Sequence, residues 1–173
     1  YGGSPVASEE IMNAVKKMSK PTIAVIRGGG ASGAYFIATG ADKIYASEMS
    51  DVGSIGVTMS YLDYSQGHSR DGIIYQQLSS GKFKDTGDPD KILTTEEKAL
   101  LMRNIKILHE AFIKKVAENR KLDIEKVRKL ADGSTMLGMA AKENGLIDEI
   151  GDLDSAKTWL LNQFQIEPSL CVY

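Results

Sequence analysis

The sequence predicts an α/β fold with a largely parallel sheet, and three observations lead to this class. Helical and strand-like patterns alternate along the 173 residues, as in folds that interleave strands with helices. The apolar run at 22–26 is β-branched and lacks polar alternation, which is typical of a strand buried on both faces. Glycines at 28–30 then turn the chain into a short apolar helix at 32–39. We expect one domain over 1–164 and a tail over 165–173.

Apolar residues at helical spacing predict the remaining helices. Pro21 ends the first helix, which begins near Ser8. Thr94 and Glu97 form a capping box that opens the longest helix, whose apolar stripe continues to Val116. The full set of expected helices is 8–20, 32–39, 62–71, 94–116, 123–131, 139–144 and 155–164.

Short apolar runs between these helices predict the strands, and a polar loop precedes the longest helix. The loop spans 79–90 and is rich in Gly, Lys and Asp. The expected strands are 22–26, 43–46, 55–59, 73–78 and 146–150.

Charge and composition argue against some classes of partner. Lys+Arg 21 against Asp+Glu 23 leave a formal net charge of -2, which gives no electrostatic reason to bind nucleic acid. No apolar run approaches the roughly 18 residues of a membrane-spanning helix. Cys171 is the only cysteine, so no intrachain disulfide is expected. The chain opens at Tyr1 in a turn-like segment, and we expect the N-terminal portion of the fold to be missing from it.

The glycine-rich segment 28–33 has three interpretations. It matches the G-x-G-x-x-G pattern of dinucleotide-binding turns, but glycine-rich stretches match that pattern easily, and the Lys and Ser/Thr of a P-loop are absent. Its glycines can also serve only to let a strand and a helix pack closely. In the third interpretation, Ser32 at the start of the helix is a nucleophile with backbone N–H donors beside it for an oxyanion. The segment by itself leaves these three open.

A nucleophilic serine needs a base to remove its proton. His109 is expected at the edge of the long helix and His68 in a polar stretch, which favours structural or exposed roles for both. Lysine can replace histidine when desolvation makes its neutral form accessible. Lys82 and Lys84 lie in the polar loop and are the candidates. Residue types and spacing alone leave the base undecided.

Four short motifs occur in order along most of the chain, and together they resemble the signal peptide peptidase A family. The motifs are ASGAYF at 31–36 with ADKI at 41–44, GSIGV at 53–57, SGKFKD at 80–85, and ADG at 131–133 with GLIDEIG at 145–151. The resemblance implies the ClpP/crotonase superfold, which repeats ββα units around a mostly parallel sheet.

The resemblance also implies catalytic roles. Ser32 matches the family's nucleophile, and Lys84, not Lys82, matches the general base. Ser54 matches a serine that hydrogen-bonds and orients that lysine. The resemblance therefore implies a Ser-Lys dyad in this chain.

The oxyanion hole is implied less directly. Gly3 matches a glycine whose backbone N–H serves this role, through the similarity of the N-terminal glycine pair to the family's P-G-G turn. Gly33 is a second candidate because its N–H directly follows the nucleophile. Tyr1 stands where the family has proline, and Pro5 is an addition after the glycine pair.

The implied function is a serine endopeptidase that degrades residual signal peptides and other short or unfolded polypeptides through an acyl-enzyme, with no metal or organic cofactor. The family's single-domain members assemble the dyad between subunits of a homo-oligomeric ring. The implied location is the bacterial cell membrane with an extracytoplasmic catalytic domain, and a cytoplasmic location is the alternative. The other functions considered are a ClpP-like peptidase with a histidine base, a crotonase-type acyl-CoA enzyme and a non-enzymatic scaffold.

Overall fold

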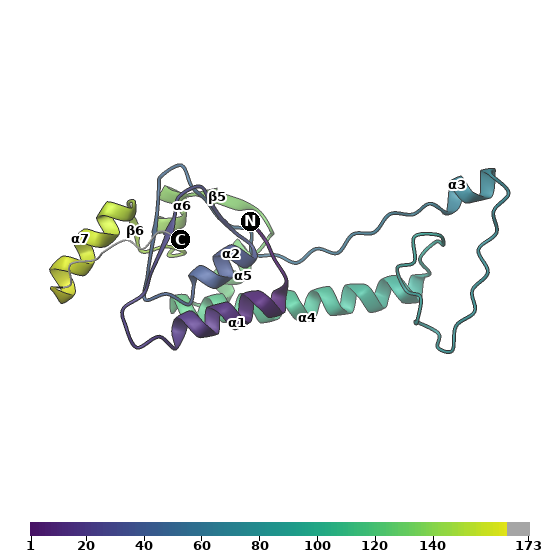
Figure 1. Ribbon diagram of the computed structural model, residues 1–173, viewed down its shortest axis with the longest axis horizontal. Helices are drawn as coiled ribbons and strands as arrows, with labels where there is room; N and C mark the ends of the chain where they lie inside the picture. The colour runs from purple at the N-terminus through teal and green to yellow at the C-terminus, as the bar shows by residue number, and fades with distance from the viewer. Residues whose placement is uncertain (166–173) are drawn as a thin grey trace, which may run out of the picture. The chain divides into compact units, whose positions relative to one another are not determined.

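The structure is a computed structural model that describes residues 1–165, and it divides into two units (Figure 1). Unit 1 comprises residues 1–56 and the chain from His109 onward, and unit 2 comprises Val57–Leu108. The expected tail, including Cys171, lies beyond Gln165 and so outside the described residues. The expectation of one peptidase domain over 1–164 stays a prediction.

The first sheet of unit 1 is parallel throughout. Its strands are β1 (Ile23–Ile26), β3 (Lys43–Ala46) and β6 (Glu149–Ile150), in the order β1-β3-β6. Ile44 and Ala46 of the central strand are fully buried. This burial agrees with the expectation of strands covered on both faces.

The second sheet of unit 1 carries the candidate site. Its strands are β2 (Gly29–Ala31), β4 (Asp51–Gly53) and β5 (Thr135–Leu137), in the order β2-β4-β5. β2 and β4 run parallel, whereas β4 and β5 run antiparallel. The class prediction of an α/β fold with a mostly parallel sheet is therefore confirmed.

Helices surround these sheets, and one of them continues from unit 2 into unit 1. The helices with residues in unit 1 are α1 (Pro5–Lys16), α2 (Gly33–Ala38), α4 (Thr95–Arg120), α5 (Ile124–Leu130), α6 (Gly138–Glu143) and α7 (Leu153–Phe164). Asp123 caps α5 by accepting hydrogen bonds from two backbone N–H groups, and this supports the expected start of that helix.

The core of unit 1 joins α2, the C-terminal part of α4 and both sheets. Tyr35, Val52 and Val116 are fully buried within it. The ring of Phe36 packs edge-on against Phe112 with centroids 5.0 Å apart. The Tyr35 hydroxyl donates to the Leu146 carbonyl at 2.8 Å, and burial raises the pKa of this phenol. α2, which directly follows Ser32, is therefore held firmly against the core.

A partly buried ion pair connects the end of α4 to the first sheet. Arg120 donates to both carboxylate oxygens of Asp148, at 3.1 and 2.7 Å, and its side chain is only 8% exposed. Asp148 also accepts from the Ile44 backbone N–H at 2.7 Å. Such two-pronged pairing satisfies most of the lone pairs that burial would otherwise leave unpaired.

Several expected strands are wrong, for identifiable reasons. Residues 55–59 form no strand, and the strand of that region is β4, which ends at Gly53. Residues 73–78 form no strand either, because nothing in unit 2 pairs with them, and Leu78 is 97% exposed. Gly29 and Gly30 were expected to lie in a turn, but they form the start of β2. The strand β5 was not expected. These short strands are defined by their pairing with distant segments. The pattern of apolar residues along the sequence does not reveal such pairing.

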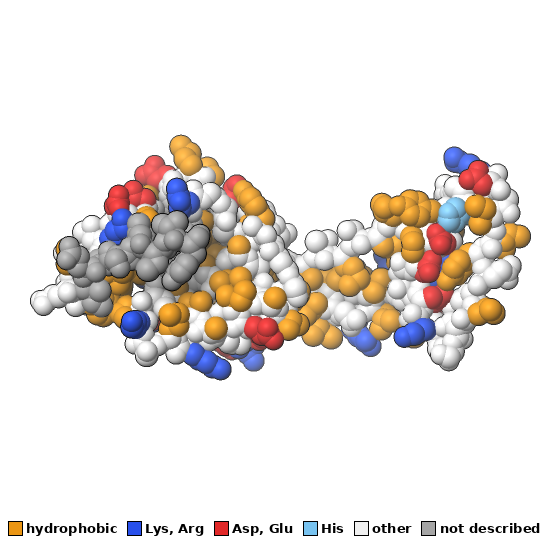
Figure 2. Space-filling view, in the orientation of Figure 1, with side chains coloured by type: hydrophobic (Ala, Val, Ile, Leu, Met, Phe, Trp, Pro, Cys, Tyr) orange, Lys and Arg blue, Asp and Glu red, His pale blue; other side chains and the backbone are white. Residues whose placement is uncertain are grey.

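Unit 2 consists of loops, the short helix α3 (Ser65–Arg70) and the first turns of α4. The capping box is confirmed: Thr94 N–H donates to Glu97 Oε2 at 2.9 Å, and Glu97 N–H donates to Thr94 Oγ1 at 3.2 Å. Glu97 is the one buried residue of this unit, and none of its hydrophobic residues is buried. Hydrophobic side chains accordingly cover part of its surface (Figure 2).

Candidate active site

Ser32 and Ser54 lie side by side at one edge of the second sheet. Ser32 directly follows β2, and Ser54 directly follows β4. Ala31 pairs with Gly53 in the parallel register of these strands, and Ser32 N–H donates to the Gly53 carbonyl at 2.8 Å. Because parallel strands end at the same edge of a sheet, the two serines predicted from sequence are neighbours.

Both serines have a backbone conformation that is rare for residues other than glycine. Ser32 has φ 55° and Ser54 has φ 50°. A non-glycine residue in this region costs of order 1 kcal/mol or more, and such residues cluster at functional sites. Ser32 is partly exposed, and its hydroxyl has no hydrogen-bond partner within residues 1–165. The strained turn therefore presents a hydroxyl that the surrounding fold does not use.

The Ser54 hydroxyl connects the site to the turn at 132–134. It donates to the Gly133 carbonyl at 3.0 Å, while the Ser54 N–H donates to the Ser134 carbonyl at 2.8 Å. Asp132 stabilises this turn by accepting from the Ser134 N–H and hydroxyl at 2.9 and 2.6 Å. A hydroxyl has one proton but two lone pairs, so Ser54 Oγ can still accept a hydrogen bond from a lysine.

The two glycines predicted for the oxyanion hole are packed together next to Ser32. Gly2 N–H donates to the Ala31 carbonyl at 3.1 Å, which holds the N-terminal segment along β2. A methyl group added at Gly33 would lie 3.1 Å from the Gly3 nitrogen and 2.6 Å from Ser8 Oγ. Only glycine at position 33 allows this close approach.

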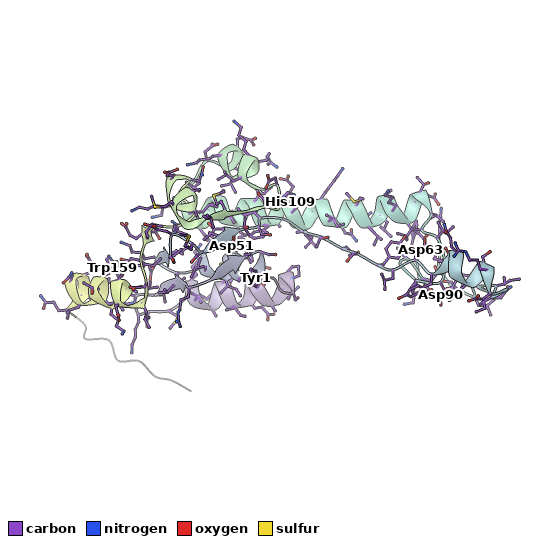
Figure 3. The ribbon with its side chains drawn as sticks, turned by 90° about the horizontal axis from the view of Figure 1, so that it is seen from above. Tyr1, Asp51, Asp63, Asp90, His109 and Trp159 are labelled. Atoms are coloured by element: carbon purple, nitrogen blue, oxygen red, sulfur yellow. The ribbon has the colours of Figure 1, made fainter. Side chains whose placement is uncertain are left out.

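Gly29, at the start of β2, leaves room for the Tyr1 ring. A methyl group added at Gly29 would lie 2.6 Å from atoms of the Tyr1 ring. Asp51 N–H donates to the Gly28 carbonyl at 2.8 Å and extends the pairing of the two strands. Tyr1 and Asp51 are both labelled in Figure 3. The glycines therefore allow the N-terminal segment to pack directly on β2.

Lys84 belongs to unit 2, in a series of tight turns. Its N–H donates to the Gly81 carbonyl at 3.0 Å, and the next turn closes with Thr86 N–H on the Phe83 carbonyl at 3.3 Å. The Lys84 side chain is exposed and has no hydrogen bond or ion pair within residues 1–165. Lys82, in contrast, pairs with Glu96 at 2.7 Å. The structure brings the two serines together in unit 1, and the predicted base lies in unit 2.

The two histidines have surroundings unrelated to the serines. His68 Nδ1 lies 3.6 Å from Asp90 Oδ1 within unit 2, and its ring packs near Tyr64. His109 lies on α4, where its Nε2 is buried without a hydrogen-bond partner among the described residues. Asp90 and His109 are labelled in Figure 3. His109, which lies in unit 1 with Ser32, has no hydrogen bond from its Nε2 to Ser32 among residues 1–165.

Sequence reasoning missed an ion cluster beside Lys84. Lys91 Nζ lies 3.2 Å from Asp85 Oδ1 and 2.5 Å from Glu97 Oε1. Asp85 is the last residue of the SGKFKD motif and directly follows the candidate base. Its position in the sequence could therefore have marked it as a residue near the site. Lys91 carries no such signal, because a lysine in a polar loop looks like any solvated charge. Ser8, whose Oγ packs against Gly33, was expected only near the start of a helix and was not predicted as a neighbour of the site.

The α/β fold, with a serine in a strained turn between a strand and a helix, is of the ClpP-like class. A solved structure of a ClpP1 mutant from Listeria monocytogenes matches with a TM-score of 0.55 and 17% sequence identity, covering 89% of this chain and 70% of that one. This likeness confirms the fold that the sequence predicted. At this identity it shows the fold alone.

The chain belongs to Peptidase family S49, whose family model matches residues 14–167. It is 40% identical over 157 residues to the Methanocaldococcus jannaschii protein named "Putative protease MJ0651", covering 90% of this chain and 50% of that protein. It is 30% identical over 158 residues to "Serine protease SPPA, chloroplastic" of Arabidopsis thaliana, covering 90% of this chain and 23% of that protein. The chain thus spans half or less of these relatives' length. The predicted resemblance to this family is confirmed.

Within residues 1–165, no helix combines the length and the apolar character needed to cross a bilayer.

Proposed function

We propose that this chain is the catalytic part of a serine endopeptidase with Ser32 as nucleophile and Lys84 as general base. The observation that carries the proposal is the unpartnered Ser32 hydroxyl in a strained turn beside Ser54, in a chain of a peptidase family. The printed name of the Arabidopsis relative describes a serine protease, which supports a serine nucleophile here. The proposed substrates are residual signal peptides and other short or unfolded polypeptides.

The reaction proceeds through an acyl-enzyme. Neutral Lys84 accepts the Ser32 Oγ proton as Oγ attacks the scissile carbonyl carbon. Backbone N–H groups of Gly3 and Gly33 donate to the resulting oxyanion. Protonated Lys84 then gives its proton to the leaving amine as the C–N bond breaks, which leaves an ester on Ser32.

The ester is hydrolysed by the same groups. Lys84, again neutral, takes a proton from water, whose oxygen attacks the ester carbonyl carbon. The proton returns to Ser32 Oγ as the C–O bond breaks, and the peptide acid is released. Ser54 accepts a hydrogen bond from Lys84 and orients it, while its own hydroxyl continues to donate to the Gly133 carbonyl.

The proposal includes a homo-oligomeric ring in which Lys84 of one subunit reaches Ser32 of another. Its support is the surface of unit 2, where none of the hydrophobic residues is buried. Ile74 is 76% exposed, Leu78 97% and Ile92 66%. Exposed apolar surface of this extent marks protein contacts. Packing against a second copy would also remove water from around Lys84, which favours its neutral form.

We further propose that the parent protein works at the bacterial cell membrane, with this part on the extracytoplasmic side. Signal peptides are left in the membrane after export, so a peptidase that degrades them must act there. Protease accessibility in spheroplasts tests this location. Protection of the chain until the cells are lysed would contradict it and favour the cytoplasm.

The test of the dyad is mass spectrometry after exposure to a serine-reactive phosphonate across about pH 6 to 10, a span that covers histidine and lysine bases. Wild type, Ser32→Ala and Lys84→Ala are compared, with Lys82→Ala as the matched control lysine. We expect labelling at Ser32 that rises with pH, is lost in the first two variants and persists in the control. Labelling that survives Lys84→Ala would return the role of base to His68 or His109.

A further inference from the structure

Asp85, Lys91 and Glu97 form a largely buried ion cluster inside unit 2, in which Glu97 is fully buried and the other two side chains are partly buried. Their side chains are 14%, 15% and 4% exposed. Lys91 Nζ lies between the two carboxylates, 3.2 Å from Asp85 and 2.5 Å from Glu97. Exposed ion pairs contribute little to stability, but breaking a buried one leaves an uncompensated charge. Because all three side chains are at most 15% exposed, this cluster is closer to a buried pair than to an exposed one.

Neutral donors satisfy the remaining carboxylate oxygens. Asp85 also accepts from the Tyr75 hydroxyl at 3.3 Å and from Gln77 Nε2 at 2.8 Å. Glu97 accepts from the Thr94 N–H at 2.9 Å and from the Thr86 hydroxyl at 3.4 Å. The cluster thus connects residues before and after the SGKFKD motif with the first turn of α4. A polar network that is this well satisfied fixes the segments that it joins.

The cluster supplies the order that an apolar core would otherwise provide. No hydrophobic residue of unit 2 is buried, and its one buried residue is Glu97. Asp85 immediately follows Lys84, and consecutive Cα atoms are about 3.8 Å apart. An anchor on Asp85 therefore fixes the Lys84 backbone closely. The Lys84 side chain takes no part in the cluster and is left without a partner within residues 1–165.

We propose that Asp85, Lys91 and Glu97 are positioning residues that hold Lys84 in place for catalysis. This inference rests on the proposed Ser32–Lys84 dyad. Lys91 is the central member, since it neutralises both carboxylates. Without it, the two acids repel each other and the segment around Lys84 loses its attachment to α4.

The chain contains a matched control for this cluster. Lys82 pairs with Glu96 at 2.7 Å, and both side chains are 63% exposed. This pair joins the same loop to the same first turn of α4, and Glu96 is the neighbour of Glu97 in the sequence. Because it is solvated, its loss has little effect. Lys82→Met and Lys91→Met thus remove the same charge from the same region and differ in burial.

The experiment compares the assembled wild type with Lys91→Met, Lys91→Arg and Lys82→Met. Turnover is measured on a short apolar peptide with a fluorogenic amide leaving group. We expect Lys91→Met to lower kcat about 10- to 100-fold with little change in KM, since small misplacements of a catalytic group cost up to this much. Lys91→Arg keeps the cation and recovers most of the loss, and Lys82→Met stays near wild type. Equal kcat values for Lys91→Met and wild type would overturn the proposal.

Hydrogen exchange gives a readout that does not depend on activity. Amides at 81–88 are expected to exchange faster in Lys91→Met than in Lys82→Met, because the cluster no longer holds the segment. Unchanged exchange there would overturn the positioning role, even with a working dyad. Conversely, phosphonate labelling of Ser32 that survives Lys84→Ala would disprove the dyad while leaving the exchange result valid. If Lys91→Met fails to fold, Asp85→Asn, which keeps an amide oxygen facing Lys91, is measured in the same way.

Discussion

Ser32 and Ser54 occupy equivalent positions, each being the first residue after one of two paired parallel strands. They follow Ala31 and Gly53, which face each other in the register of β2 and β4. Both have positive φ, 55° and 50°. A residue with positive φ directly after each of the two paired strands therefore places the proposed nucleophile and the proposed orienting hydroxyl side by side.

Substitutions at Ser54 separate backbone strain from hydrogen bonding. Ser54→Ala and Ser54→Gly both lose the bond to the Gly133 carbonyl, but only glycine relieves the positive φ. We expect Ser54→Gly to be more stable than Ser54→Ala by about 1 kcal/mol, measured by denaturant unfolding. Both variants should show strongly reduced turnover. Equal stability of the two variants would mean that φ at this position carries no strain.

Gly33→Ala tests the close packing beside the proposed oxyanion hole. The added methyl would lie 2.6 Å from Ser8 Oγ and 3.1 Å from the Gly3 nitrogen, so we expect a loss of about 1–3 kcal/mol in stability and of most turnover. Gly28→Ala is the control, because a methyl group there meets nothing within 4 Å. Ser8→Ala removes one of the two obstructing atoms and should partly restore the stability of Gly33→Ala. A fully active Gly33→Ala would argue against this arrangement.

The stability of unit 2 should depend on acid through Glu97. Hydrogen bonds from Lys91 and from the Thr94 backbone lower the pKa of Glu97 from 4.5 to about 2. A lowered carboxyl pKa stabilises the fold above its unfolded value, and this stabilisation is lost as pH falls through the folded value. We therefore expect the free energy of unfolding to decline between about pH 4.5 and 2. The decline should be smaller in Glu97→Gln, and denaturant titrations at several pH values measure the difference.

The pH dependence of peptide cleavage identifies the base. A lysine base predicts turnover that keeps rising into the alkaline range, whereas a histidine base predicts a rise near about pH 6 to 7. His68→Gln and His109→Gln should leave the alkaline profile unchanged. A plateau reached near neutrality, abolished by either substitution, would contradict lysine as the base.

Local signals in the sequence predicted the parts of the fold that depend on neighbours along the chain. The Thr94–Glu97 capping box appears as expected, and the helix expected from residue 123 begins at Ile124 with Asp123 as its cap, because each feature needs only residues within one turn. The short strands β4 and β5 escaped prediction, since distant partners define them. An exposed run such as 73–78 was mistaken for a strand, because its apolar residues resemble those of a buried one.

The candidate site likewise has features that the sequence predicted and features that it did not. The motifs pointed to Ser32, Ser54 and Lys84, but the adjacency of the two serines depends on strand register, which sequence does not display. Lys91 could not be found at all. Its burial arises from partners on both sides in the chain, and a lone lysine in a polar loop gives no sign of them.

The absence of buried hydrophobic residues in unit 2 has a calorimetric consequence. The heat capacity change of unfolding comes mainly from apolar surface that becomes hydrated. Unit 2 already exposes that surface, so its opening in an isolated chain should add almost nothing to the heat capacity change, which unit 1 will dominate. Association that covers the same side chains should instead produce a clearly negative heat capacity change, and titration calorimetry of subunit dilution would then measure how much of unit 2 is covered.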